Sequence, residues 1–94
     1  MTEVTYAVIA RVPPHGVQHF QEYEDAVLAL LPAHGGRLDR RVRSADGILE
    51  IHLVVFDSAD GLERFRSDPR RLAAAGLLHR SGAELELTHV TAAP

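Results

Sequence analysis

The chain has 94 residues, of which 46% are hydrophobic and 24% are charged, a composition typical of a folded globular protein. Its formal net charge is -3 at pH 7 and its sequence pI is about 6.0, so we expect no nucleic-acid partner, because such proteins usually present a basic face. Cysteine is absent, which excludes disulfides, thiolate metal sites and cysteine nucleophiles.

The first predicted element is a strand over residues 4–12, VTYAVIARV, which ends at a Pro-Pro pair because proline cannot continue a central ladder. Glu3 and Arg11 limit its apolar run, so we expect neither a signal peptide nor a membrane span, and a cytoplasmic location. The length predicts one domain over residues 1–94, small enough that pairing with a second copy would help to bury a core.

A helix is predicted next, over residues 15–34, because apolar side chains recur on one stripe and a Gly-Gly pair then stops it. Glu24 lies at the edge of this stripe, where we expect it to pair with an arginine. His15 and His19 are one turn apart, a spacing that can hold a metal ion. They lie on the solvated side and no HExxH pattern is present, so we expect no metal site.

The rest of the chain predicts a hairpin, a helix and a last strand. Strands over residues 36–43 and 48–56 are joined by a turn whose Asp-Gly pair is a strong hairpin signal. Ser58 is expected to cap a second helix, which an Asp-Pro pair restarts. A fourth strand follows over residues 83–90, and residues 91–94 are expected to form a loose tail.

This βαββαβ order predicts an α+β fold, the ferredoxin-like plait, with a four-stranded antiparallel sheet and both helices on one face. Side chains alternate along a strand, so four apolar ones, Leu49, Ile51, Leu53 and Val55, are expected under the helices. The helix-free face is then expected to carry Asp39, Arg41, Glu50, His52, Glu86, Val54 and Phe56.

The hairpin register decides which charged residues meet, and two registers are open. With a four-residue loop, Arg41 faces Glu50 and Asp39 faces His52. With a two-residue loop, Arg43 faces Glu50 and Arg41 faces His52. Both registers place these charges on one face, where each opposite-charge pair contributes roughly 0.2–1 kcal/mol.

His52 is the strongest candidate for a catalytic base, because an acid that orients an imidazole is the usual arrangement for one. Asp39 would orient His52, and Arg41 or Tyr6 would stabilise an enolate charge. The alternative is an ion-paired sheet face or a dimer interface without chemistry. A core position for Tyr6 and a helix-end position for His34 are further alternatives. The side chains expected to contact a substrate are Tyr6, His34, Glu50, Glu86 and Phe56.

Three segments, FQEYEDAVLALLPAHGGRL, LVVFDSADGLERF and the SDP before the last helical stretch, carry a resemblance that covers nearly the whole chain. With them the chain resembles the dimeric α+β barrel superfamily, which includes the antibiotic-biosynthesis monooxygenases, and within it a small uncharacterised family. The resemblance implies a homodimer with two sheets packed face to face. In enzyme members it implies a small hydrophobic substrate between sheet and helices, but it transfers no catalytic set to this chain.

Two functions therefore remain open. The first is a cofactor-independent monooxygenase or polyketide cyclase that acts on a small aromatic or polyketide-like molecule. The second is a non-enzymatic homodimer that binds a ligand or regulates another protein. An open cleft that reaches His52 would favour the enzyme, whereas a closed, fully ion-paired face would favour the second function.

Overall fold

The structure is a computed structural model that describes residues 2–93, and its centre is a four-stranded sheet. Neighbouring strands are antiparallel and lie in the order β2-β3-β1-β4, which is the order of a ferredoxin-like plait. The fold expected from the sequence is therefore confirmed. The strands are β1 (Val4–Arg11), β2 (Gly36–Arg43), β3 (Leu49–Phe56) and β4 (Glu84–Val90).

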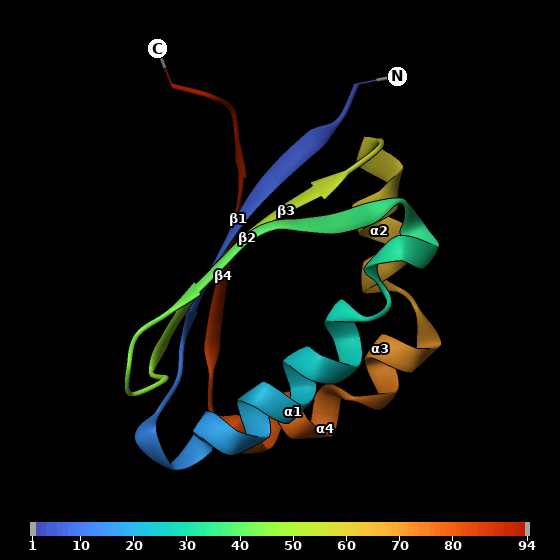
Figure 1. Cartoon of the computed structure of the whole chain (residues 1–94). Coiled ribbons are helices and arrows are strands. Elements are labelled where there is room, and N and C mark those ends of the chain that lie inside the picture. Colours follow the sequence, from blue (N-terminus) through green and yellow to red (C-terminus); the bar gives the residue numbers. More distant parts are fainter. Residues whose placement is uncertain (1, 94) are drawn as a thin grey trace.

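All helical segments cover one face of the sheet (Figure 1). Each of the two predicted helices is divided, and the Asp-Pro restart is observed: the Asp68 carboxylate accepts a hydrogen bond of 2.8 Å from the backbone N–H of Arg70. Residues 91–93 have no regular structure, and Pro94 lies outside the described residues. The helical segments are η1 (Pro14–Gly16), α1 (Val17–Leu28), η2 (Leu31–His34), α2 (Ala59–Arg66), α3 (Pro69–Ala73) and α4 (Ala75–Ser81).

The prediction of which sheet face lies under the helices was wrong. Glu50 and His52 face the helices and are 1% and 2% exposed, whereas Leu49 is 37% exposed on the other face. Alternation shows which residues share a face but not which face receives the helices, and both faces of β3 are apolar enough to be covered. The polar pair is therefore enclosed inside the molecule.

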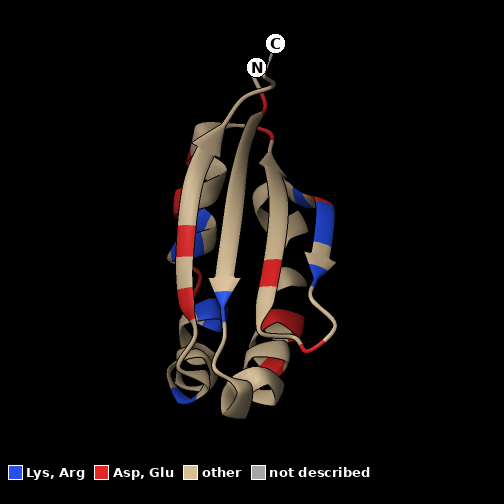
Figure 2. Ribbon diagram, turned by 90° about the vertical axis from the view of Figure 1, so that its left-hand side faces the viewer, with Lys and Arg blue, Asp and Glu red and all other residues tan. Residues whose placement is uncertain are grey.

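Figure 2 shows the helix-free face of the sheet from the front, and β3 carries only apolar side chains on this face, at Leu49, Ile51, Leu53 and Val55. The central strand β1 carries one charged residue, Arg11, at its end. Arg11 forms an exposed ion pair of 3.6 Å with Glu86 of the edge strand β4. Within residues 2–93, none of the helices has the length and apolar content needed to cross a membrane.

Two buried clusters pack the sheet against the helices, and His52 lies between them along the strands. One cluster contains Leu31, Val54, Phe56 and Leu62, and the other contains Ala10, Val12 and Phe20. His52 is opposite Val8 of β1. On the same face of the sheet, Val54 of the first cluster is two residues from His52, and Ala10 of the second cluster is two residues from Val8 on the other side. The space between the clusters holds the polar residues described next.

Candidate functional site

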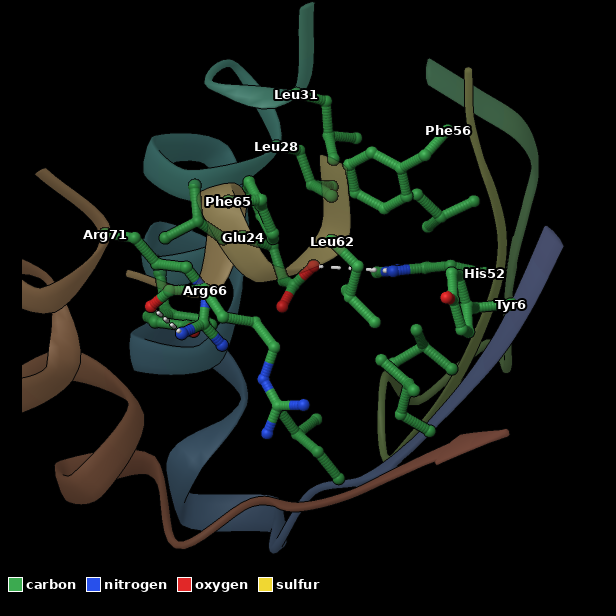
Figure 3. A pocket seen from close by; sticks show the side chains of 16 residues that line it. Tyr6, Glu24, Leu28, Leu31, His52, Phe56, Leu62, Phe65, Arg66 and Arg71 are labelled. Carbon is green, nitrogen blue, oxygen red and sulfur yellow. Dashed lines mark hydrogen bonds and ion pairs between the residues drawn. The ribbon is translucent and has the colours of Figure 1, made fainter. Parts of the chain in front are cut away.

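A cavity of about 290 Å³ lies between the sheet and the helices (Figure 3). This volume lies just below the roughly 300–1,000 Å³ typical of ligand pockets, so a ligand must be small. Apolar and aromatic side chains form most of its wall, and His52, Glu24 and two arginines form the polar part. The lining residues are Tyr6, Val8, Tyr23, Glu24, Val27, Leu28, Leu31, His52, Val54, Phe56, Leu62, Phe65, Arg66, Arg71, Leu85 and Leu87.

His52 lies between two buried carboxylates in this region. Its Nε2 is 2.8 Å from Oε1 of Glu50, which points to the same side of β3 because the two residues are two positions apart. Its Nδ1 is 3.5 Å from Oε2 of Glu24, which reaches across from α1 (Figure 3). The hydrogen bond at Nε2 orients the imidazole, so that its Nδ1 faces the Glu24 carboxyl group.

Two arginines of β2 form ion pairs with the Glu50 carboxylate. The Nε–H of Arg41 donates to Oε1 of Glu50, and the Nε–H of Arg43 donates to Oε2 at 3.2 Å. An ionised carboxylate only accepts hydrogen bonds, so this network assigns the proton of the neutral imidazole to Nε2 of His52. Nδ1 is then left with a lone pair that faces Glu24.

The surroundings displace the pKa of all three groups. Burial raises the pKa of Glu24 from 4.5 to about 7, and the nearby Glu50 charge adds to this increase. Burial lowers the pKa of His52, although the hydrogen bond to Glu50 opposes the change. For Glu50, burial alone would raise the pKa, but hydrogen bonds from His52, Arg41 and Arg43 outweigh it and hold the pKa below 4.5. Near neutral pH, Glu50 is therefore the anion and Glu24 is the group that gains or loses a proton.

We expect the Glu24→Gln variant to lose less stability than the wild type as the pH rises from 4.5 to 7. Glu24 keeps its proton to a higher pH when folded than when unfolded, so its contribution is complete below pH 4.5 and is lost by about pH 7. A pKa increase of this size corresponds to about 3 kcal/mol. Urea unfolding at several pH values measures the difference.

Wild type and Glu24→Gln have to be compared, because His52 contributes a pH dependence of stability with the opposite sign. The lowered pKa of His52 gives a contribution that is lost as the pH falls below 6.5, and it is present in both proteins. Parallel pH profiles for wild type and Glu24→Gln would show that Glu24 is not protonated in the folded state near neutral pH.

The expected pairing of Asp39 with His52 was wrong, because the hairpin register places Arg41 opposite His52, and Asp39 lies in a bulge farther from the turn. Between Leu38, which pairs with Val54, and Arg40, which pairs with Leu53, Asp39 is an extra, exposed residue. Between the turn and the bulge, Arg43 faces Glu50 and Arg41 faces His52. This is the second of the two predicted registers, and Glu24 and Glu50 take the place that was expected for Asp39.

The other candidate residues divide between the cavity and the surface. Tyr6 and Phe56 line the cavity. Glu50 does not line it, but is hydrogen-bonded to His52, which does. His34 is held outside it, with Nε2 at 2.8 Å from Oδ2 of Asp68. Glu86 lies on the helix-free face in its pair with Arg11.

Sequence reasoning missed the cavity-lining Glu24, Arg66 and Arg71. Glu24 could have been found, because Phe20 and Leu28 lie one turn before and after it on the buried side of α1. Instead of the expected arginine, its buried partner is His52. Arg66 is the last residue of α2 and Arg71 lies in α3. The sequence pattern gives no indication of a cavity at either position. Within residues 2–93, no cluster of three His, Asp or Glu side chains is arranged to hold a metal ion.

Comparison with known proteins gives similarity in structure only, since no protein-family model and no curated protein sequence matches the chain. Rv0793 from Mycobacterium tuberculosis has a TM-score of 0.78 at 19% identity, over 99% of this chain and 97% of its own. SnoaB, a cofactor-independent oxygenase from Streptomyces nogalater, has a TM-score of 0.75 at 21% identity, over 100% and 96%. A candidate antibiotic biosynthesis monooxygenase from Caulobacter crescentus has a TM-score of 0.73 at 14% identity, over 96% and 91%.

These similarities confirm the resemblance of the fold to that of the antibiotic biosynthesis monooxygenase-like proteins. At such low identities they establish the fold alone, and the same fold supports many unrelated functions. The chemistry of this chain therefore depends on the cavity and its polar residues.

Proposed function

We propose that the protein is an enzyme that removes a proton from a small aromatic or polyketide-like substrate and lets the resulting enolate react with dioxygen without a bound cofactor. The observation that carries this proposal is the position of His52, which is buried between two carboxylates in the wall of an apolar cavity. A cavity that reaches His52 is the feature expected of an enzyme and not of a closed, fully ion-paired face.

The base in this proposal is the pair formed by Glu24 and Nδ1 of His52. Two interacting groups of this kind titrate together, and they accept one proton as a unit. A pKa of about 7 at Glu24 makes the pair a stronger base at neutral pH than an ordinary carboxylate. Glu50 accepts from Nε2 and compensates the positive charge when the imidazole holds the extra proton.

The chemistry after proton removal needs little from the protein. An electron-rich enolate reacts directly with dioxygen at carbon, and loss of water from the hydroperoxide leaves a carbonyl group. Anthrone is a suitable probe, because one molecule of dioxygen converts its CH₂ group to the C=O of anthraquinone and releases one water. The Tyr6 hydroxyl in the cavity wall is proposed to donate a hydrogen bond to the enolate oxygen.

We expect the purified protein to consume dioxygen and form anthraquinone from anthrone faster than buffer does, with equal rates after treatment with a chelator. An oxygen electrode measures the dioxygen consumed, and absorbance spectra measure the anthraquinone formed. Saturable binding of anthrone without any oxygen uptake would contradict the proposal and favour the non-enzymatic function, a ligand-binding or regulatory homodimer. The homodimer itself is proposed to form through the apolar helix-free face.

A further inference from the structure

Two arginines line the cavity on the side of the helices, across from His52 (Figure 3). Arg66 comes from the end of α2, and 56% of its side chain is exposed, so this end of the cavity meets solvent. Arg71 comes from α3, and its guanidinium lies over the ring of Phe65 at 5.4 Å from the centroid. The wall therefore presents two cations beside aromatic surface.

Neither guanidinium is fully satisfied by the residues around it. One terminal nitrogen of Arg71 donates to the backbone carbonyl of Arg66 at 3.3 Å, whereas its Nε is buried and has no partner among the described residues. A buried donor of this kind is costly unless an acceptor is supplied. Arg66 is 3.8 Å from Glu63, which is too long for a hydrogen bond, and both side chains are exposed.

The charges around the cavity do not cancel. The negative charge of Glu50 is compensated by its ion pairs with Arg41 and Arg43, so it does not balance the arginines of the cavity. Glu24 is the one carboxyl group among the cavity-lining residues, and it faces His52 from α1. Arg66 and Arg71 thus leave a positive excess in the cavity of a chain whose net charge is -3.

We propose that the cavity binds an aromatic carboxylate, with its carboxylate group on Arg66 and Arg71 and its ring between the aromatic side chains. A guanidinium donates two parallel hydrogen bonds to a carboxylate, and the unpartnered Nε–H of Arg71 is one such donor. The anchored acid group fixes the ring with its far edge toward His52, which is the orientation that proton removal requires. This inference deepens the proposed function, since it assigns the substrate class of the same cavity.

The probes are salicylate, which is an anion at neutral pH, and salicylamide, which has the same ring and hydroxyl group without the charge. We expect protein-observed NMR titration to give a dissociation constant for salicylate that is at least about tenfold lower than that for salicylamide. This is the difference expected from one charge-assisted hydrogen bond. Arg71→Gln and Arg66→Gln should each reduce this preference, and the double variant should abolish it. Salicylamide binding should be unchanged, which shows that the cavity is intact.

Arg64→Gln is the matched control, because Arg64 is an exposed residue of α2 outside the cavity wall and its replacement removes the same charge. Equal affinity for the two probes, or a preference that persists in the double variant, would overturn the inference. Failure here and failure of the proposed enzyme are separable. Binding is measured without turnover, and oxygen uptake from uncharged anthrone does not require the carboxylate contact.

Discussion

We expect the Glu50→Gln variant to unfold with a free energy about 3 kcal/mol lower than that of the wild type. Removal of one partner from a buried ion network typically costs about 3–5 kcal/mol, because the remaining charges keep their desolvation penalty. Glu50 is 1% exposed and accepts from Arg41, Arg43 and His52. The side chains of Arg41 and Arg43 are 29% and 38% exposed, so water relieves part of the loss and places it at the lower end of this range.

Urea unfolding with an unchanged m-value measures this loss, and Glu86→Gln provides the matched control. Glu86 also pairs with an arginine, but the side chains of Glu86 and Arg11 are 59% and 63% exposed, so its replacement should change stability by less than about 1 kcal/mol. The pKa of Glu50 is lowered from 4.5, so its contribution is present above pH 4.5 and declines as the pH falls through the folded pKa. Equal losses in the two variants at neutral pH would show that Glu50 does not organise the interior.

Local sequence features were sufficient to predict the elements and their order. The strand over residues 36–43 has the same bounds in the structure, since a Gly-Gly pair precedes it and a turn with Asp-Gly follows. The break at Asp68 was equally readable, because its side chain caps the next helix. Signals of this kind act within a few residues, so they do not depend on how the layers later pack.

The arrangement of the site was only partly predictable, because it depends on contacts between distant elements. Glu50 and His52 share a face by strand alternation alone. The identity of the second acid required knowledge that α1 covers this face, which the apolar residues on both sides of β3 conceal. The bulge at Asp39 also shifts the alternation of β2, so that Arg37 and Arg41, expected on one face, lie on opposite faces.

In the proposed reaction, we expect His52→Gln to lower kcat for anthrone oxidation roughly a hundredfold to ten-thousandfold, the contribution typical of a positioned base. Glutamine can retain a hydrogen bond to Glu50 but accepts no proton at neutral pH. Glu24→Gln should have an effect of similar size, because the Glu24 carboxyl group lies 3.5 Å from Nδ1 of His52 and the two groups are proposed to act as one base.

The double variant, His52→Gln with Glu24→Gln, separates a catalytic pair from two independent contributions. Residues that act as one unit are not additive, so the double variant should be no slower than the slower single variant. Asp39→Asn is the control, because Asp39 is exposed in the bulge and its replacement should leave kcat unchanged. Multiplied losses in the double variant, or wild-type turnover by a folded His52→Gln protein, would contradict the assignment of His52 and Glu24 as the base.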